Sequence, residues 1–245
     1  MSWIALLLIG TGIADLGHSI RPVKVVPEVC GAMTVIVLGV FCDLTSIRDL
    51  IALFVIAGFV VAWGRTVRLG FGQDRAWLPL SVFASALLIA LALSPLAGEG
   101  AGRAADWLAD TPIEVLHGVE VDRALLVLGA LLLQMSTGNV IVRLVLRATG
   151  TVDPARGVAH DATRTLKGGR LLGPMERLFI VGLGLAGHVT AASIVIAAKG
   201  LLRFPELQSK RDESAGPSID EVTEYFLVGS FVSWMISLAS LVLLA

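Results

Sequence analysis

Long apolar runs separated by short polar pieces dominate this chain. A helix needs about 20 mostly apolar residues to cross the hydrocarbon core of a membrane, and seven runs approach that length. We therefore predict an all-α, polytopic transmembrane helical bundle with six or seven membrane helices, built as a single integral membrane domain over residues 1–245. The expected helices are residues 3–20, 25–42, 47–64, 77–97, 121–147, 178–198 and 225–245.

Composition supports this class. The 245 residues are 56% hydrophobic and 16% charged, with a mean hydropathy of +0.83, whereas ordinary soluble domains carry about 25% charged residues. The net charge of −1 does not favour nucleic acid as a partner. Cys30 and Cys42 lie in one apolar run and are interpreted as small core residues. No basic region precedes the first run, which favours an uncleaved helix over a signal peptide.

Basic residues predict the orientation of the chain, because they gather on the cytoplasmic side. The loop after the third run carries Arg65, Arg68 and Arg75, and residues 143–177 hold seven basic residues and three acids. Both segments are expected inside. The loop after the fourth run holds six acids and is expected outside. This scheme also places the N-terminus outside.

Two segments allow two interpretations each. Residues 178–198 either cross the membrane once, which is simpler for 21 near-apolar residues, or fold back at Gly187 and His188 as a re-entrant pair. The re-entrant form returns the following basic residues to the inside. Residues 102–118 mix acids with Trp107 and aliphatic side chains, so they form either a helix on the membrane surface or an ordered cap.

Polar side chains follow the apolar first half of residues 121–147 and would lie near the bilayer midplane. Such groups normally face other protein or a water-filled cavity. His188 lies near the middle of the sixth run, where an imidazole could relay protons or bind a metal. One interpretation is a pathway that ends on two arginines. The other is an interhelical hydrogen-bond seam with arginines reaching the interface. The pathway or ligand-binding candidates are Gln134, Ser136, Thr137, Asn139, Arg143, Arg147 and His188.

Other polar groups form smaller constellations. Asp15 and His18 are three residues apart on one helical face, as a hydrogen-bonded pair or two metal ligands would be, but two ligands are too few to assign a metal. No cofactor is predicted. Gly229, Ser233 and Ser237 recur every four residues, a spacing that suits close packing within the chain or a homo-oligomer seam. A charge cluster, either a structural clamp or a functional group, is expected from Glu176, Arg177, Lys199, Arg203 and Glu224.

Residues 168–235 resemble the C-terminal part of an uncharacterised family of bacterial inner-membrane proteins, a domain of unknown function. The matching pieces are residues 169–170, 173–178, 196–199, 202–204 and 224–226, with Gly229 and Ser233. The resemblance implies a multi-pass protein of the bacterial cytoplasmic (inner) membrane and carries no activity. Members of that family often have a histidine four residues before an aspartate in the first helix. Here Thr11 stands at that position before Asp15.

Three functions remain open. The first is transport or conduction of a small solute or ion along the polar lane, by an oligomer. The second is a membrane scaffold that docks a partner through its basic loops. The third is an enzyme acting on lipid headgroups, with arginines gripping phosphate, although no Walker A, His-Glu-x-x-His or Gly-x-Ser-x-Gly sequence is present. The expected partners are membrane lipids, including anionic headgroups, and a second copy of the chain, with no nucleic acid.

Overall fold

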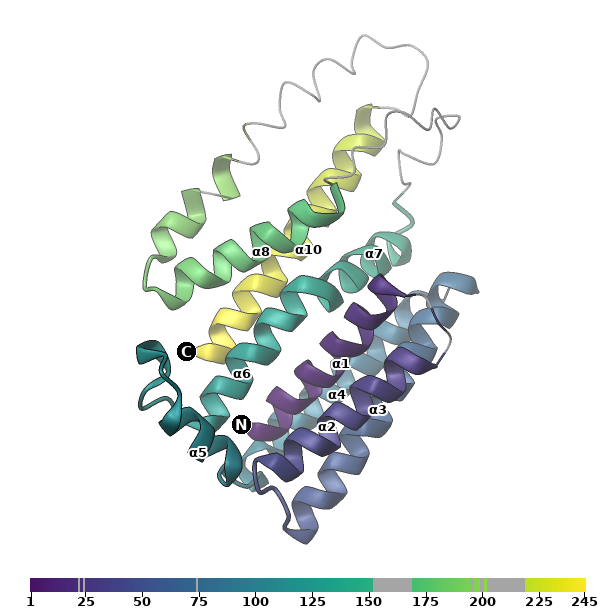
Figure 1. Cartoon of the computed structure of the whole chain (residues 1–245). Coiled ribbons are helices and arrows are strands. Elements are labelled where there is room, and N and C mark those ends of the chain that lie inside the picture. Colours follow the sequence, from purple (N-terminus) through teal and green to yellow (C-terminus); the bar gives the residue numbers. More distant parts are fainter. Residues whose placement is uncertain are drawn as a thin grey trace. The chain divides into compact units, whose positions relative to one another are not determined.

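The computed structural model describes residues 1–21, 23, 25–73, 75–151, 169–194, 196–198, 201 and 219–245. All regular secondary structure within these ranges is helical, which confirms the predicted fold class in its coarse form (Figure 1). The chain forms two compact units, Met1–Val140 and Ile141–Leu243, called here the N-terminal and C-terminal units.

The N-terminal unit is built from long helices joined by short connections. Its elements are α1 (Ser2–Ile20), α2 (Val26–Phe41), α3 (Ile47–Gly72), α4 (Trp77–Leu93), a 3₁₀ turn (Ser94–Leu96), α5 (Arg103–Asp110), a second 3₁₀ turn (Glu114–Leu116), α6 (Val121–Leu132), a π-helix (Leu133–Thr137) and the start of α7 (Gly138–Ala148).

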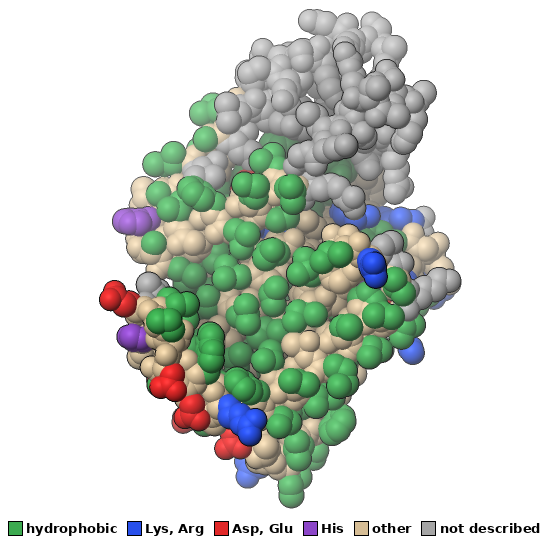
Figure 2. Space-filling model, viewed as in Figure 1, with side chains coloured by type: hydrophobic (Ala, Val, Ile, Leu, Met, Phe, Trp, Pro, Cys, Tyr) green, Lys and Arg blue, Asp and Glu red, His purple; other side chains and the backbone are tan. Residues whose placement is uncertain are grey.

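Five helical stretches in the described residues are long and apolar enough to cross a membrane, fewer than the six or seven predicted. These are Ser2–Ile20, Ile47–Gly72, Trp77–Leu96, Val121–Ala148 and Thr223–Leu244. Helix α2 is shorter, at 16 residues. Its Val29, Met33 and Val37 are nevertheless 48%, 53% and 58% exposed at four-residue spacing, so α2 presents an apolar stripe outward. Figure 2 shows hydrophobic side chains along the visible sides of these helices.

Local sequence signals begin several of these helices. Ser46 caps α3: its hydroxyl accepts a hydrogen bond from the Asp49 backbone N–H at 3.2 Å and donates one to the Asp49 carboxylate at 2.6 Å. Pro27 stands in the first turn of α2, where its missing N–H costs nothing.

Helix α1 forms the core of the N-terminal unit. It packs against α2, α3, α6 and the π-helix, and residues 4–9 are at most 1% exposed. A side chain on Gly31 would collide with the Gly10 carbonyl, so these two glycines let α1 and α2 approach closely. A membrane-length helix buried on all sides leaves its polar residues surrounded by protein.

The C-terminal unit contains the rest of α7, α8 (Gly169–Leu185) and α10 (Ile219–Leu244). Helix α8 ends before a turn at Ala186 and Gly187, where Gly187 adopts φ +80°. A separate apolar helical stretch, Val189–Ala198, follows. Residues 178–198 therefore form two helical stretches and not one continuous helix. The break lies at the position where the re-entrant interpretation placed the turn. Glycine adopts the left-handed backbone conformation that commonly ends a helix.

Two smaller predictions are also decided. Cys42 is buried, but Cys30 is exposed on α2 and is not a core residue. Within residues 102–118, α5 buries Ala104 and Leu108 and leaves Trp107 58% exposed. This segment is therefore packed onto the N-terminal unit by one face and presents an aromatic side chain on the other.

Candidate functional site

Two carboxylates are buried inside the N-terminal unit. Asp15 of α1 is 5% exposed and Glu28 of α2 is 1% exposed. Ionisable groups among membrane helices are costly and commonly mark ion or proton sites. Their surroundings therefore define the candidate site, which we call the acid cluster: Asp15, His18, Glu28, Trp63, Arg68 and Thr137.

The carboxylate of Asp15 is held by an indole from α3. Trp63 Nε1 donates to both Asp15 oxygens, at 3.2 and 3.0 Å, and Trp63 is itself 1% exposed. Its ring also packs against Phe83 of α4, with centroids 5.1 Å apart. Thr137 of the π-helix lies close to the same carboxylate, and its Oγ1 is buried without a hydrogen-bond partner among the described residues. Three helical elements thus converge on one acid.

Glu28 has an asymmetric environment. Its Oε1 forms an ion pair with Arg68 Nη1 at 3.0 Å and lies 3.2 Å from His18 Nε2. Its Oε2 is fully buried, and no hydrogen-bond partner reaches it from the described residues. Buried polar atoms in proteins are nearly always paired, so an orphan oxygen of a charged group points to a bound water, ligand or proton.

The packing around Glu28 is close. A Cβ built on Gly64 of α3 would overlap the Glu28 side chain and lie 2.8 Å from Oε1. Glycine at this position is what allows the acid to lie between α2 and α3. By contrast, a Cβ on Gly58 of the same helix would meet nothing within 4 Å.

The acid cluster is reached from one end of the unit. The His18 and Arg68 side chains are 28% and 35% exposed, whereas residues 4–9 of α1 form a dry apolar segment on the other side of Asp15. We call the end at which the His18 and Arg68 side chains are partly exposed the Arg68 end. The opposite end of the unit is the Met1 end.

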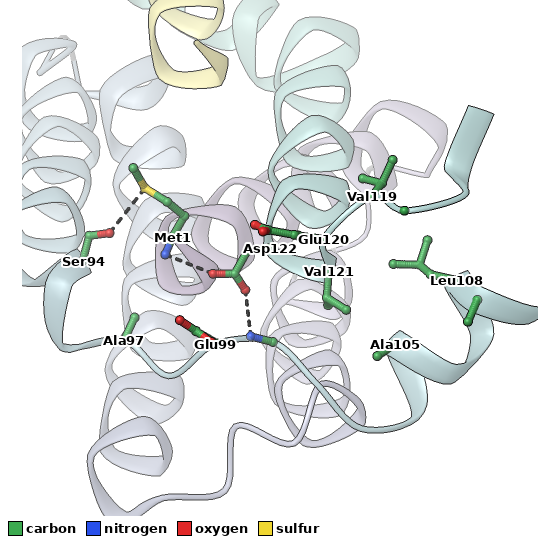
Figure 3. A pocket seen from close by; sticks show the side chains of 13 residues that line it. Met1, Ser94, Ala97, Glu99, Ala105, Leu108, Val119, Glu120, Val121 and Asp122 are labelled. Atoms are coloured by element: carbon green, nitrogen blue, oxygen red, sulfur yellow. Dashed lines mark hydrogen bonds and ion pairs between the residues drawn. The ribbon is translucent and has the colours of Figure 1, made fainter. Parts of the chain in front are cut away.

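The Met1 end is closed by a second set of polar contacts. Trp3 Nε1 donates to Asp49 at 2.9 Å, and the Gly98 N–H donates to the same carboxylate at 3.1 Å. Asp122 accepts from the Met1 ammonium at 3.2 Å and from the Gly100 N–H at 2.9 Å. Figure 3 shows the Asp122 contacts beside a pocket of about 600 Å³ that is also lined by Glu99, Glu120 and residues of α5. In Figure 2, acidic side chains gather near α5.

The structure distributes the predicted polar lane over both units. Gln134, Ser136 and Thr137 are buried in the π-helix, which packs against α1. Asn139 is half-buried in α7. π-Helical turns are frequent at functional sites, and this one coincides with the polar residues. Thr137 is the lane residue that meets the acid cluster.

The remaining lane candidates belong to the C-terminal unit. Arg143 is exposed, Arg147 is partly exposed, and His188 is exposed directly after the Gly187 turn. Their membership of a common pathway with the π-helix stays a prediction.

Asp15 and His18 have separate hydrogen-bond partners, Trp63 and Glu28. Within the described ranges, no group of three or more histidine, cysteine or acidic residues is arranged to hold a metal ion. The pair therefore belongs to a hydrogen-bonded cluster that extends across α2 and α3.

The predicted charge cluster is described in part. Trp234 Nε1 donates to Glu176 at 2.9 Å, and Arg177, which is 1% exposed, donates to Ser233 at 3.1 Å. These contacts join α8 to α10 within the C-terminal unit. Glu224 is exposed. Lys199 and Arg203 lie outside the described residues.

Sequence reasoning missed three residues of the acid cluster: Glu28, Trp63 and Arg68. Glu28 had a usable signal, because a lone acid inside an apolar run is a functional candidate by default. The sequence placed Arg68 in a loop, where it served only to predict the orientation of the chain. In the structure, α3 extends to Gly72, so Arg68 lies on that helix. Trp63 could not be singled out from the sequence, because a tryptophan in an apolar run is expected there for packing alone.

Comparison with protein-family models, curated proteins and solved structures found no match to this chain. The functional argument therefore rests on the geometry of the acid cluster.

Proposed function

We propose that this protein transports a small solute or ion across a membrane and that the acid cluster is the binding site for the transported or coupled ion. The observation that carries the proposal is the burial of Asp15 and Glu28 among apolar helices. Removing a charge from water costs several kcal/mol, so such groups persist where they are paired or perform a function.

A purely structural charge clamp is the simpler explanation, and the orphan Oε2 of Glu28 argues against it. A clamp stabilises a fold when all its buried atoms are paired, and a half-satisfied network is worse than an apolar core. Here Oε1 has two partners and Oε2 has none among the described residues. Such an arrangement suits a site that gains and loses a ligand.

The asymmetry of access also supports transport. The cluster opens toward the Arg68 end, and the apolar segment 4–9 closes the path toward the Met1 end. This is the arrangement of a transporter site open to one side. The basic character of the Arg68 end and the acids of the Met1 end support the predicted orientation, with the Arg68 end facing the cytoplasm of a bacterium. The positive-inside rule separately assigns Arg143 and Arg147 to the cytoplasmic side, where they would contact anionic headgroups.

Reconstitution tests the proposal. Purified full-length protein in liposomes is assayed for flux of protons and monovalent cations, as wild type and as Asp15→Asn and Glu28→Gln. We expect both substitutions to abolish flux while circular dichroism and gel filtration stay unchanged. Asp106→Asn is the matched control, because Asp106 is an exposed acid on α5. Flux that survives both substitutions, or wild-type liposomes with no flux, would contradict the proposal and favour the scaffold hypothesis.

A further inference from the structure

With His18 neutral, the described residues of the acid cluster carry one net negative charge. Asp15 and Glu28 contribute two negative charges, and Arg68 contributes one permanent positive charge. Among the described residues, the titratable and charged groups that face Glu28 are Asp15 and His18 from α1 and Arg68 from α3. An uncompensated charge is costly in this surrounding, so one additional cation is needed for neutrality.

The missing cation is small. Gly64 packs directly on Glu28, and the described residues offer no set of three metal-ligating side chains. Divalent cations such as Ca²⁺ need several oxygen ligands around them. A proton needs neither space nor a ligand shell, and His18 is already placed 3.2 Å from Glu28 to deliver it.

We infer that the acid cluster binds one exchangeable proton, which enters at the Arg68 end through His18 and is held by Glu28. This inference rests on the proposed transport function and names its ion. A hydronium ion on the aqueous side transfers a proton to His18 and leaves a water molecule. The Nε2–H bond of the imidazolium then breaks and leaves its electron pair on nitrogen, while an O–H bond forms on Glu28 Oε1. Rotation of the carboxyl group exchanges its two oxygens and places the proton on the buried side.

The cluster stays neutral throughout this step. Before it, imidazolium and guanidinium balance two carboxylates. After it, guanidinium balances Asp15 alone, because both His18 and Glu28 are neutral. The buried oxygen that has no partner then carries a hydroxyl, which costs less to bury than a charged oxygen. The step leaves the hydrogen bonds of Asp15 intact, since Trp63 donates to both of its oxygens.

Infrared spectroscopy tests the proton site without any transport measurement. Detergent-purified full-length protein is titrated from acid to alkaline pH, and the carbonyl stretch of buried carboxylic acid is followed. We expect a band that disappears with rising pH and is absent in Glu28→Gln, with one proton fewer taken up per chain. Asp106→Asn should keep the band. A Glu28→Gln spectrum identical to that of the wild type would overturn the inference.

A second variant covers the case in which Glu28→Gln does not fold. His18→Gln keeps the acid and removes the relay, so the band should persist while its exchange with deuterium slows by about tenfold or more, a barrier increase of about 1.4 kcal/mol. Unchanged exchange would overturn the route through His18.

A Glu28 band without wild-type flux would retain the proton site and reject transport. Flux lost in Glu28→Gln without any titrating band would retain transport and reject the proton.

Discussion

The indole of Trp63 donates to both carboxylate oxygens of Asp15, across 48 residues of sequence, at 3.2 and 3.0 Å. This contact links α1 to α3 in the core of the N-terminal unit. It supplies a buried acid with a hydrogen-bond donor that carries no charge. The acid cluster therefore depends on Trp63 as a positioning residue.

Replacing Trp63 with phenylalanine should destabilise the protein. The aromatic packing on Phe83 is largely kept, but the Asp15 carboxylate loses its buried donor, which costs about 1–3 kcal/mol. Thermal unfolding in detergent, followed by circular dichroism, measures the change. Trp107→Phe is the control, because Trp107 is 58% exposed on α5. Equal unfolding temperatures for the two variants would contradict the assigned contact.

Replacing Gly64 with alanine should disrupt the acid cluster. The added methyl group would overlap the Glu28 side chain, and overpacking of this kind costs about 1–3 kcal/mol. Gly58→Ala in the same helix should be neutral or stabilising, since a methyl group there meets nothing within 4 Å. Unfolding midpoints of the two variants, compared side by side, check the prediction. It fails if Gly64→Ala is as stable as Gly58→Ala.

Cys42 should resist thiol reagents in the folded protein. Burial raises the pKa of its thiol above the ordinary value of 9.0, and the nearby charge of Asp122 raises it further. The thiolate is the reactive form, so its population stays low until the pH exceeds this raised pKa. In a Cys30→Ser background, maleimide labelling should be slow at neutral pH, faster at alkaline pH and complete after denaturation. Rapid labelling of the folded protein at neutral pH would show that the site is open.

Ser233→Ala should weaken the C-terminal unit. The buried Arg177 guanidinium loses one acceptor at 3.1 Å, a loss of about 1 kcal/mol for a group that keeps other contacts. Ser193→Ala is the control, because that hydroxyl is exposed and bonds only to its own helix at Val189. Urea or detergent denaturation of both variants measures the difference. A result of equal stability would mean that the α8–α10 contact contributes nothing.

Much of the fold could be predicted because apolar runs and helix caps are local features. The runs at 3–20, 47–64, 77–97, 121–147 and 225–245 all correspond to described helices. The boundaries of α3 were harder, since eight further residues after Gly64 continue the helix despite two arginines. The sequence allowed a break at Gly187 as one of two interpretations of residues 178–198. Hydropathy alone favoured the other interpretation, a single continuous helix. Hydropathy averages over a window and does not register one left-handed residue.

The sequence by itself determined that this is an all-helical chain with membrane-length apolar helices, because length and hydropathy are summed along the chain. The tertiary structure alone decided which polar groups meet. Trp63 reaches Asp15, and Arg68 and His18 reach Glu28, only because α1, α2 and α3 pack with particular rotations and with a glycine at position 64. Sequence spacing fixes faces within one helix. It contains no information about the rotation of one helix against another, and that rotation creates the acid cluster.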